Sequence, residues 1–199
     1  MVATRLAKDK KKSRRLGAEV VFWDEFGFSF QEELATTWAR RGKRPIFRRV
    51  TKERRAVSTA VALTLSGKIY KKHFEGSVNS EALIETLEHV QRQIPGKIIL
   101  VWDRASIHLS KITKAYLQRH PEILIEQLPA YAPQLNPEEY CHGNVKQRLK
   151  NARPESKKEI RSMLDRGFAR FSRLPGTTCP EHRCRFHAGA QFYRAGHAR

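Results

Sequence analysis

The sequence lacks any apolar run that approaches the roughly 18 residues needed to cross a membrane. Its N-terminus is basic, but the apolar segment that completes a secretory signal does not follow. Only three cysteines are present, Cys141, Cys179 and Cys184, and an odd number without a signal is typical of a reducing compartment. These absences predict a cytoplasmic protein without a membrane partner.

Acidic residues are also scarce. There are 20 of them against 39 lysines and arginines, which leaves a net charge of +19. An excess of this size indicates a polyanionic partner, and nucleic acid is the partner we expect. An anionic membrane surface is the weaker alternative, because the sequence shows no basic amphipathic helix with an aromatic face.

The basic residues gather in three runs. Residues 5–15 hold seven basic residues and one acid, residues 40–55 hold nine and one, and residues 146–161 hold seven and two. A single run of this kind is typical of a solvated face. Three runs in a chain of 199 residues favour a surface that follows a phosphate backbone.

Apolar patterning predicts a mixed α/β sheet with helices on its faces. Segments with strand and helix patterns follow one another as three strands, helix, strand, helix, strand, helix, helix. Aromatic residues at every second position in residues 26–30 also predict a hairpin directly after the first strand. The predicted strands are residues 18–24, two within 56–76, 97–103 and 122–128; the predicted helices are residues 80–94, 110–120, one that begins after Asn136, and 155–171.

Two strands of the same character end in aspartate, at Asp24 and Asp103. Ligand sites of open α/β sheets gather at strand ends, where an acid is held rigidly and still faces a cleft. One such aspartate is weak evidence for a site, because it also suits a turn. Two matched aspartates favour a site.

A third acid stands at a predicted helix start. Asn136 suits an N-cap, Pro137 suits the first helical position, and Glu139 completes a capping-box pattern. Acids in a first turn also suit the helix dipole, so local structure alone explains both Glu138 and Glu139. The alternative is that one of these glutamates belongs to a metal site.

Three carboxylates that lie close together repel one another, so their burial requires a cation. Mg²⁺ is the hard ion usually found with carboxylates and phosphates. Two such ions about 4 Å apart assist an in-line displacement at phosphorus. Together with the basic surface, this chemistry predicts a nuclease or a phosphoryl transferase that acts on DNA or RNA.

At this point the motifs resemble a known family, the bacterial insertion-sequence transposases of the mariner superfamily, in its IS-six-thirty branch. The resemblance covers nearly the whole chain in the right order, and its third and fourth motifs together are highly specific. The matching motifs are VVFWDEFGFS (20–29), TWARRGKRP (37–45), VWDRASIH (101–108), LPAYAPQLNPEEY (128–140) and FHAGAQFY (186–193).

The resemblance implies an RNase H-like fold with a mixed five-stranded sheet and a triad of acids. Motif register assigns the triad to Asp24, Asp103 and Glu139, with Glu138 left as a first-turn acid. The implied cofactor is a pair of Mg²⁺ ions, for which Mn²⁺ substitutes. The implied reaction is cleavage of DNA by water at the transposon ends, followed by joining of the freed 3′ hydroxyl to target DNA at the dinucleotide TA. The implied assembly is a homodimer on DNA, in the bacterial cytoplasm near the nucleoid.

Further residues are expected around this triad. His108 is expected to lie near the site as a supporting or loop residue rather than as a metal ligand, and Glu25 is expected to point away from Asp24. Trp38 and its neighbours are expected on a hairpin that contacts DNA, with a packed turn as the alternative. The residues expected to bind DNA are Arg40, Arg41, Lys43, Arg44, Lys146 and Lys150.

We expect three parts in the chain: a basic segment at 1–16, the catalytic domain at 17–175 and a closing segment at 176–199. The cysteines and histidines of residues 179–187 match no common zinc spacing, so they are expected to be loop or packing residues. Full-length relatives carry a pair of helix-turn-helix modules before the first acid, which stands at residue 24 here. The chain is therefore expected to be the second frame of a split transposase, a truncated product or a fragment.

Two other functions stay open at this stage. Relatives also carry a tryptophan shortly after the glutamate, where this chain has Cys141-His142-Gly143. The first alternative is therefore an inactive DNA-binding remnant of a transposase. The second is an RNase H-like nuclease that is unrelated to transposition.

Overall fold

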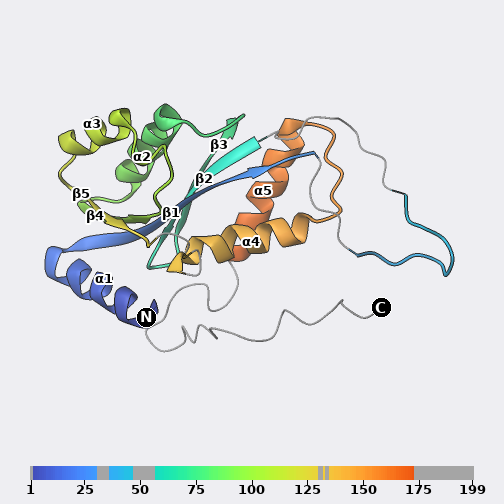
Figure 1. Ribbon diagram of the computed structural model, residues 1–199, viewed down its shortest axis with the longest axis horizontal. Helices are drawn as coiled ribbons and strands as arrows, with labels where there is room; N and C mark the ends of the chain where they lie inside the picture. The colour runs from blue at the N-terminus through green and yellow to red at the C-terminus, as the bar shows by residue number, and fades with distance from the viewer. Residues whose placement is uncertain (1, 31–35, 47–56, 130–131, 133–134, 173–199) are drawn as a thin grey trace.

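The structure, a computed structural model, describes residues 2–30, 36–46, 57–129, 132 and 135–172 (Figure 1). Five strands form one mixed sheet in the order β3-β2-β1-β4-β5. The predicted mixed five-stranded sheet is confirmed. On one side, β1 (Ala18–Phe28) pairs antiparallel with β2 (Val57–Thr64), and β2 pairs antiparallel with β3 (Ile69–Glu75). On its other side, β1 pairs in parallel with β4 (Lys97–Trp102), and β4 pairs in parallel with β5 (Ile123–Gln127).

Helices cover both faces of this sheet (Figure 1). α2 and α3 pack on one face, and α4 and α5 pack on the other. The alternation of side chains along β1 separates the two layers: Trp23 packs toward α2, whereas Phe26 and Phe28 pack against α4 and α5. The helices are α1 (Val2–Leu16), α2 (Ser80–Gln93), α3 (Lys111–Arg119), α4 (Pro137–Leu149) and α5 (Lys157–Ser172).

The hairpin predicted within residues 26–30 is wrong. β1 continues without interruption to Phe28, where Phe26 pairs with Thr59 and Phe28 with Val57 of β2. The aromatic alternation extends the period-two pattern of the first strand, because both rings are needed to cover the same helical layer. The long β1 carries Asp24 in its middle rather than at its end.

The basic N-terminal segment contains a helix, α1, which was not predicted from the sequence. Its Leu16 packs with Val20 of β1, Ser13 Oγ donates to the carbonyl of Ala18 at 2.6 Å, and Lys12 pairs with Glu126. α1 lies mainly against β1 and β4, and Lys12 also reaches β5. Within the described part of the chain, no helix has both the length and the apolar character needed to span a membrane.

Candidate metal centre

Two of the predicted acids, Asp24 and Asp103, lie near the place where β1 and β4 pair in parallel. Phe22 pairs with Val101, and both side chains belong to one apolar cluster. Asp24 stands two residues beyond Phe22 within β1, and Asp103 directly follows the last residue of β4, so the two backbones lie close to each other in the sheet. The two acids predicted at strand ends are therefore neighbours in backbone position.

Asn136 joins the start of α4 to β1. As the predicted N-cap, its Oδ1 accepts from the N–H of Glu138 at 3.2 Å, and Pro137 follows in the first turn. Its Nδ2 donates to the carbonyl of Trp23 at 3.0 Å and to Asp24 Oδ2 at 3.4 Å. The side chain is buried, so these bonds hold the helix start against Asp24 out of contact with water.

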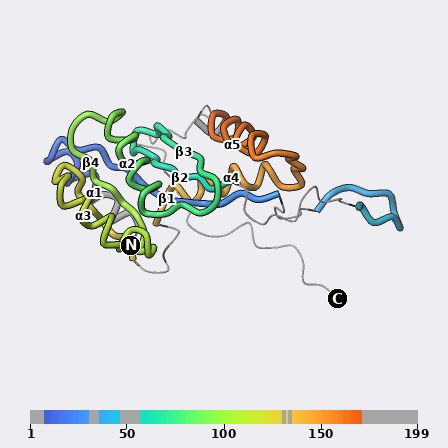
Figure 2. Tube along the Cα trace, turned by 90° about the horizontal axis from the view of Figure 1, so that it is seen from above, coloured from blue at the N-terminus to red at the C-terminus, as the bar shows by residue number. Residues whose placement is uncertain are grey.

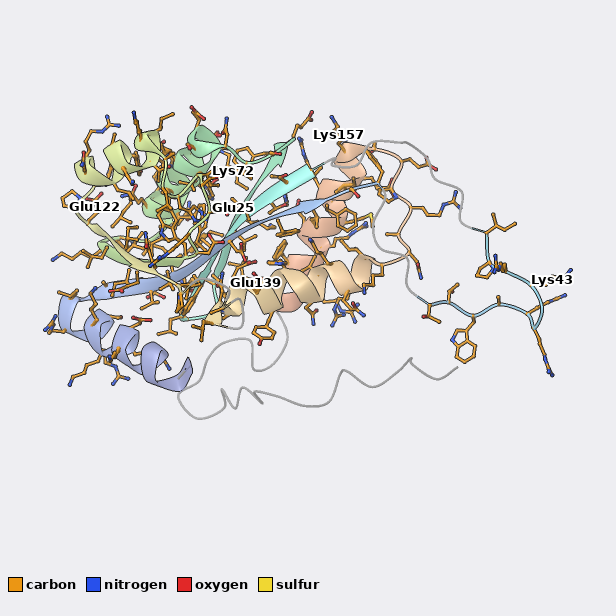
Figure 3. The ribbon with its side chains drawn as sticks, viewed as in Figure 1. Glu25, Lys43, Lys72, Glu122, Glu139 and Lys157 are labelled. Carbon is orange, nitrogen blue, oxygen red and sulfur yellow. The ribbon has the colours of Figure 1, made fainter. Side chains whose placement is uncertain are left out.

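Asp24, Glu139 and His142 form a cluster in which one ligand atom of each lies within 4.8 Å of the others. Glu139 lies in the first turn of α4 (Figure 3), and its Oε2 is 3.4 Å from His142 Nε2. His142 Nδ1 is 3.9 Å from Asp24 Oδ2, and the ring stacks on Phe26 with centroids 4.9 Å apart. The structure thus brings together two of the three predicted acids and adds a histidine.

The adjacent glutamate has a different environment. Glu138 is fully buried, and its Oε2 lies 2.7 Å from His142 Nδ1. Its other oxygen, Oε1, has no hydrogen-bond partner among the described residues. Glu138 is a first-turn acid, as predicted, but it also contacts the histidine of the cluster.

Burial and the closeness of the carboxylates disfavour the charged forms of the acids in this cluster. Burial raises the pKa of Asp24 to about 8, and Glu138 and Glu139 raise it too, while His142 opposes them. Burial also raises the pKa of Glu138 well above its usual value, with Glu139 adding to the rise. A bound cation relieves such repulsion. The oxygen-rich donor set and the unpaired Oε1 of Glu138 therefore fit a divalent ion.

Asp103 lies outside this cluster, because His108 and a backbone amide hold its carboxylate. Its Oδ1 is 2.9 Å from His108 Nδ1 and accepts from the Ala105 N–H at 2.9 Å. The ring of His108 stacks on Trp102 with centroids 4.2 Å apart, and its Nε2 is 3.0 Å from Glu25 Oε1. The bond to His108 lowers the pKa of Asp103. Burial alone would lower the pKa of His108, but Asp103 and Glu25 raise it to about 9.

The contacts of Glu25 agree with its expected direction. Its Oε1 accepts from Trp23, whose side chain packs in the layer of α2, and it meets His108 in the same region. Glu25 therefore faces away from Asp24, as expected. His108 contacts Asp103, and its role at the site stays a prediction.

His142 was not predicted from the sequence as a site residue. A signal was available, because His142 stands three residues after Glu139 and four after Glu138, which places all three on one helix face. Only the tertiary contact with Asp24 shows that this face meets β1.

Four of the predicted DNA-binding residues, Arg40, Arg41, Lys43 and Arg44, lie in residues 36–46, which Figures 1 and 2 show extending away from the sheet. The segment turns where the Lys43 N–H donates to the Arg40 carbonyl at 2.9 Å, and all its residues are exposed. Trp38 is 100% exposed, so the alternative of a packed turn is wrong. The turn forms without β-strands among residues 36–46.

The other two predicted DNA-binding residues lie on α4. Lys146 Nζ lies 5.3 Å from the centre of the Phe26 ring, the ring on which His142 stacks, and Lys150 is the C-cap of the helix. Lys146 therefore places a positive charge next to the candidate metal centre. Three further predictions concern residues 48–55, 176–199 and the motif 186–193, which lie outside the described residues.

Comparison with known proteins agrees with this architecture. The family model described as "DDE superfamily endonuclease" matches residues 19–161. A search of curated protein sequences finds no match. The fold is similar to a Mos1 transposase paired-end complex with the left transposon end, at 21% identity and a TM-score of 0.64 over 84% of this chain and 52% of that chain. It is also similar to the catalytic domain of Mos1 mariner transposase, at 20% identity and a TM-score of 0.60 over 84% and 77%.

The similarity to these structures confirms the predicted RNase H-like fold. A third similar structure, the Mos1 mariner paired end complex with Mn, has 21% identity and a TM-score of 0.61 over 80% of this chain and 51% of that chain. The present chain spans about half the length of the Mos1 chains in these complexes.

Proposed function

Because the chain belongs to the DDE superfamily of endonucleases, we propose that it is the catalytic domain of a transposase of the mariner superfamily, in the IS-six-thirty branch. Its reaction is metal-dependent cleavage of DNA followed by strand transfer. The observation that carries the proposal is the meeting of Asp24 and Glu139, from β1 and α4, in a charged cluster that fits a cation. The similarity to Mos1 complexes that contain a transposon end supports DNA as the substrate.

We propose that Asp24, Asp103 and Glu139 hold the metal. Divalent ions at such a site, Mg²⁺ or Mn²⁺, activate the attacking oxygen and stabilise the leaving one. The residues of this chain supply position and charge: β1 fixes Asp24, and the first turn of α4 presents Glu139. The position of Asp103, directly after the strand that pairs in parallel with β1, supports its inclusion, and its carboxylate leaves His108 when it joins the site.

Phosphate binding is assigned to Arg40, Arg41, Lys43 and Arg44 of the exposed turn and to Lys146 and Lys150 of α4. Lys146 lies next to the cluster, so it is placed to bind a phosphate of the strand that enters the site. We further propose a homodimer on DNA, insertion at the dinucleotide TA, and a bacterial nucleoid setting. The boundaries of the catalytic domain are proposed at residues 17 and 175.

A nicking assay tests this function. The chain is incubated with supercoiled plasmid and Mn²⁺ or Mg²⁺, and conversion to the open circle is followed on a gel. We expect Asp24→Asn, Asp103→Asn and Glu139→Gln each to slow nicking by about 10²- to 10³-fold, the usual effect of losing one preorganised electrostatic contact in an active site. Asp165→Asn is the matched control, because Asp165 of α5 pairs with Lys71 and His73 rather than with the cluster, and this variant retains the activity of the unmodified chain.

Two outcomes would replace the proposal. DNA binding without metal-dependent nicking would identify an inactive remnant. Cleavage of an RNA–DNA hybrid without nicking of DNA would identify an RNase H-like nuclease.

A further inference from the structure

His142 has the environment of a histidine that binds a metal. Its Nε2 lies near Glu139 Oε2, and one ligand atom from the ring lies within 4.8 Å of those of Asp24 and Glu139. On one side the ring is fixed by stacking on Phe26, with an interplanar angle of 20°. The position of the His142 ring is therefore set by its packing on Phe26 of β1.

Glu138 fixes the second ring nitrogen. Its Oε2 lies 2.7 Å from Nδ1, and the glutamate is fully buried. Metal-binding histidines usually donate the N–H of their other nitrogen to a carboxylate, which orients the ring and leaves a lone pair for the ion. With the proton on Nδ1, Nε2 is the nitrogen that presents its lone pair beside Glu139.

An independent observation also points to a cation here. Glu138 Oε1 is buried without a hydrogen-bond partner among the described residues, on a side chain whose other oxygen contacts the cluster. A buried carboxylate oxygen without a partner is costly unless a positive charge compensates it. A cation held by Asp24, Glu139 and His142 supplies that charge.

We propose that His142 Nε2 is a metal ligand beside Asp24 and Glu139, that Glu138 is its positioning residue, and that the nitrogen makes the site prefer Mn²⁺ to Mg²⁺. This inference rests on the proposed function, because it concerns the same site. Mg²⁺ strongly favours oxygen ligands. Mn²⁺ also suits carboxylates, but as a first-row transition ion it accepts an imidazole nitrogen more readily than Mg²⁺ does. One nitrogen among carboxylates therefore shifts the preference toward Mn²⁺.

Pulsed electron paramagnetic resonance of the full chain with Mn²⁺ tests the bond directly. Nitrogen bound to Mn²⁺ modulates the electron spin echo, and we expect this modulation in the unmodified chain and its loss in His142→Gln. Calorimetry with Mn²⁺ and with Mg²⁺ measures the preference. We expect His142→Gln to weaken Mn²⁺ binding at least about 10-fold, and Glu138→Gln about 10- to 100-fold, as for loss of a partner that orients a ligand. Mg²⁺ binding changes less in His142→Gln.

His120→Gln is the matched control. His120 also stacks on an aromatic ring, Tyr116, at 4.2 Å between centroids, and its Nδ1 also lies 2.9 Å from a carboxylate, that of Glu122. It stands after α3, on the other face of the sheet, so its replacement leaves the echo modulation and the affinity unchanged. Circular dichroism confirms that each variant is folded.

The outcomes separate the two proposals. Mn²⁺ binding that is lost in Asp24→Asn but shows no nitrogen modulation, and is unaffected by His142→Gln, overturns the role of His142 and leaves the metal site standing. Mn²⁺ binding that is unaffected by Asp24→Asn overturns the metal site itself, and the proposed function with it.

Discussion

At the scale of single residues, Asn136 both caps α4 and binds this helix to β1. Its oxygen caps α4, and its amide nitrogen reaches the carbonyl of Trp23 and the carboxylate of Asp24. Both functions are served by one buried side chain. The distance between Asp24 and Glu139 therefore depends on this residue, because it fixes the first turn of α4 to β1.

The double role of Asn136 predicts a larger loss of stability than an ordinary cap gives. Asn79 caps α2 by accepting from the Ala82 N–H at 2.9 Å, and it is exposed. We expect Asn79→Ala to lower the free energy of unfolding by about 1 kcal/mol, the usual value for a cap. Asn136→Ala also leaves buried polar groups of Trp23 and Asp24 without their donor, so we expect a loss of about 2–4 kcal/mol.

Urea denaturation of the two variants, monitored by circular dichroism, measures this difference. Equal losses for the two asparagines would show that the contacts with β1 contribute nothing beyond the cap.

The residues of the site differ in how far the sequence reveals them. Asn136 and Pro137 were predicted as a helix start because capping is a local rule. His142 was not predicted, because its role needs the approach of α4 to β1. The carboxylate of Asp103 was predicted to face the metal site, but the structure holds it on His108, a contact between loop and strand that no local pattern encodes.

At the scale of elements, two glycines on facing helices differ in how much space surrounds them. A Cβ added at Gly143 of α4 meets nothing within 4 Å, whereas one added at Gly167 of α5 lies 2.8 Å from Val145 Cγ1. The close approach of α5 to α4 therefore requires a glycine only at residue 167. This contact lies in the cluster that covers Phe26.

Alanine at these two positions is expected to change stability in opposite directions. Gly143→Ala raises the free energy of unfolding by about 0.5–1 kcal/mol, because alanine favours the helix and fits the space. Gly167→Ala gains the same helical preference but forces Val145 aside, and overpacking of this kind costs about 1–3 kcal/mol. Thermal or urea unfolding of the two variants measures both changes, and stabilisation by Gly167→Ala would show that α5 moves easily away from α4.

The contact between His73 of β3 and Asp165 of α5 predicts that stability depends on pH. His73 Nδ1 lies 2.8 Å from Thr59 Oγ1, and its Nε2 lies 3.2 Å from Asp165. Burial lowers the pKa of His73, although Asp165 opposes the shift. A lowered pKa means that the unfolded chain takes up the proton first as the pH falls. This contribution to stability is therefore present above the ordinary histidine pKa of 6.5 and is lost as the pH falls through the folded value.

The free energy of unfolding of the metal-free chain, measured in urea from pH 7.5 to pH 5, tests this contribution. We expect it to decrease with acidification by at most about 1.4 kcal/mol per pH unit from a single proton. Subtraction of the same curve for His73→Gln isolates the histidine from other titrating groups. Parallel curves for the two proteins would contradict the assignment.

At the scale of the whole molecule, the sheet was predictable and some of its details were not. Apolar runs identify β1, β2 and β4 because most of their residues are buried. The two edge strands, β3 and β5, are only partly buried. The hairpin predicted after the first strand was wrong, because alternation alone does not show where a strand ends. α1 was missed because its apolar residues are few, and it is held by contacts with the sheet, such as that of Leu16 with Val20.

The distribution of charge is also a property of the whole molecule. The net charge is +19, but the lysines and arginines do not all contribute equally to the positive surface, because carboxylates neutralise some of them. Lys72 pairs with Glu85 at 2.6 Å and Lys157 with Glu75 at 3.2 Å, both on the surface of the main body. Lys43, in contrast, lies in the exposed turn that extends from the sheet (Figure 3).

This contrast predicts which cations bind DNA. Each lysine or arginine that neutralises a phosphate releases counterions, so the logarithm of affinity falls with the logarithm of salt concentration by about 0.9 per contact. The double variant Arg41→Ala, Lys43→Ala is expected to reduce this slope by about 2. Lys72→Ala with Lys157→Ala removes the same net charge from ion-paired positions and is expected to change the slope much less. Fluorescence anisotropy with a labelled duplex, from 50 to 300 mM salt, measures both. If the two double variants reduce the slope equally, DNA senses only the net charge of the protein, and the exposed turn has no special part in binding.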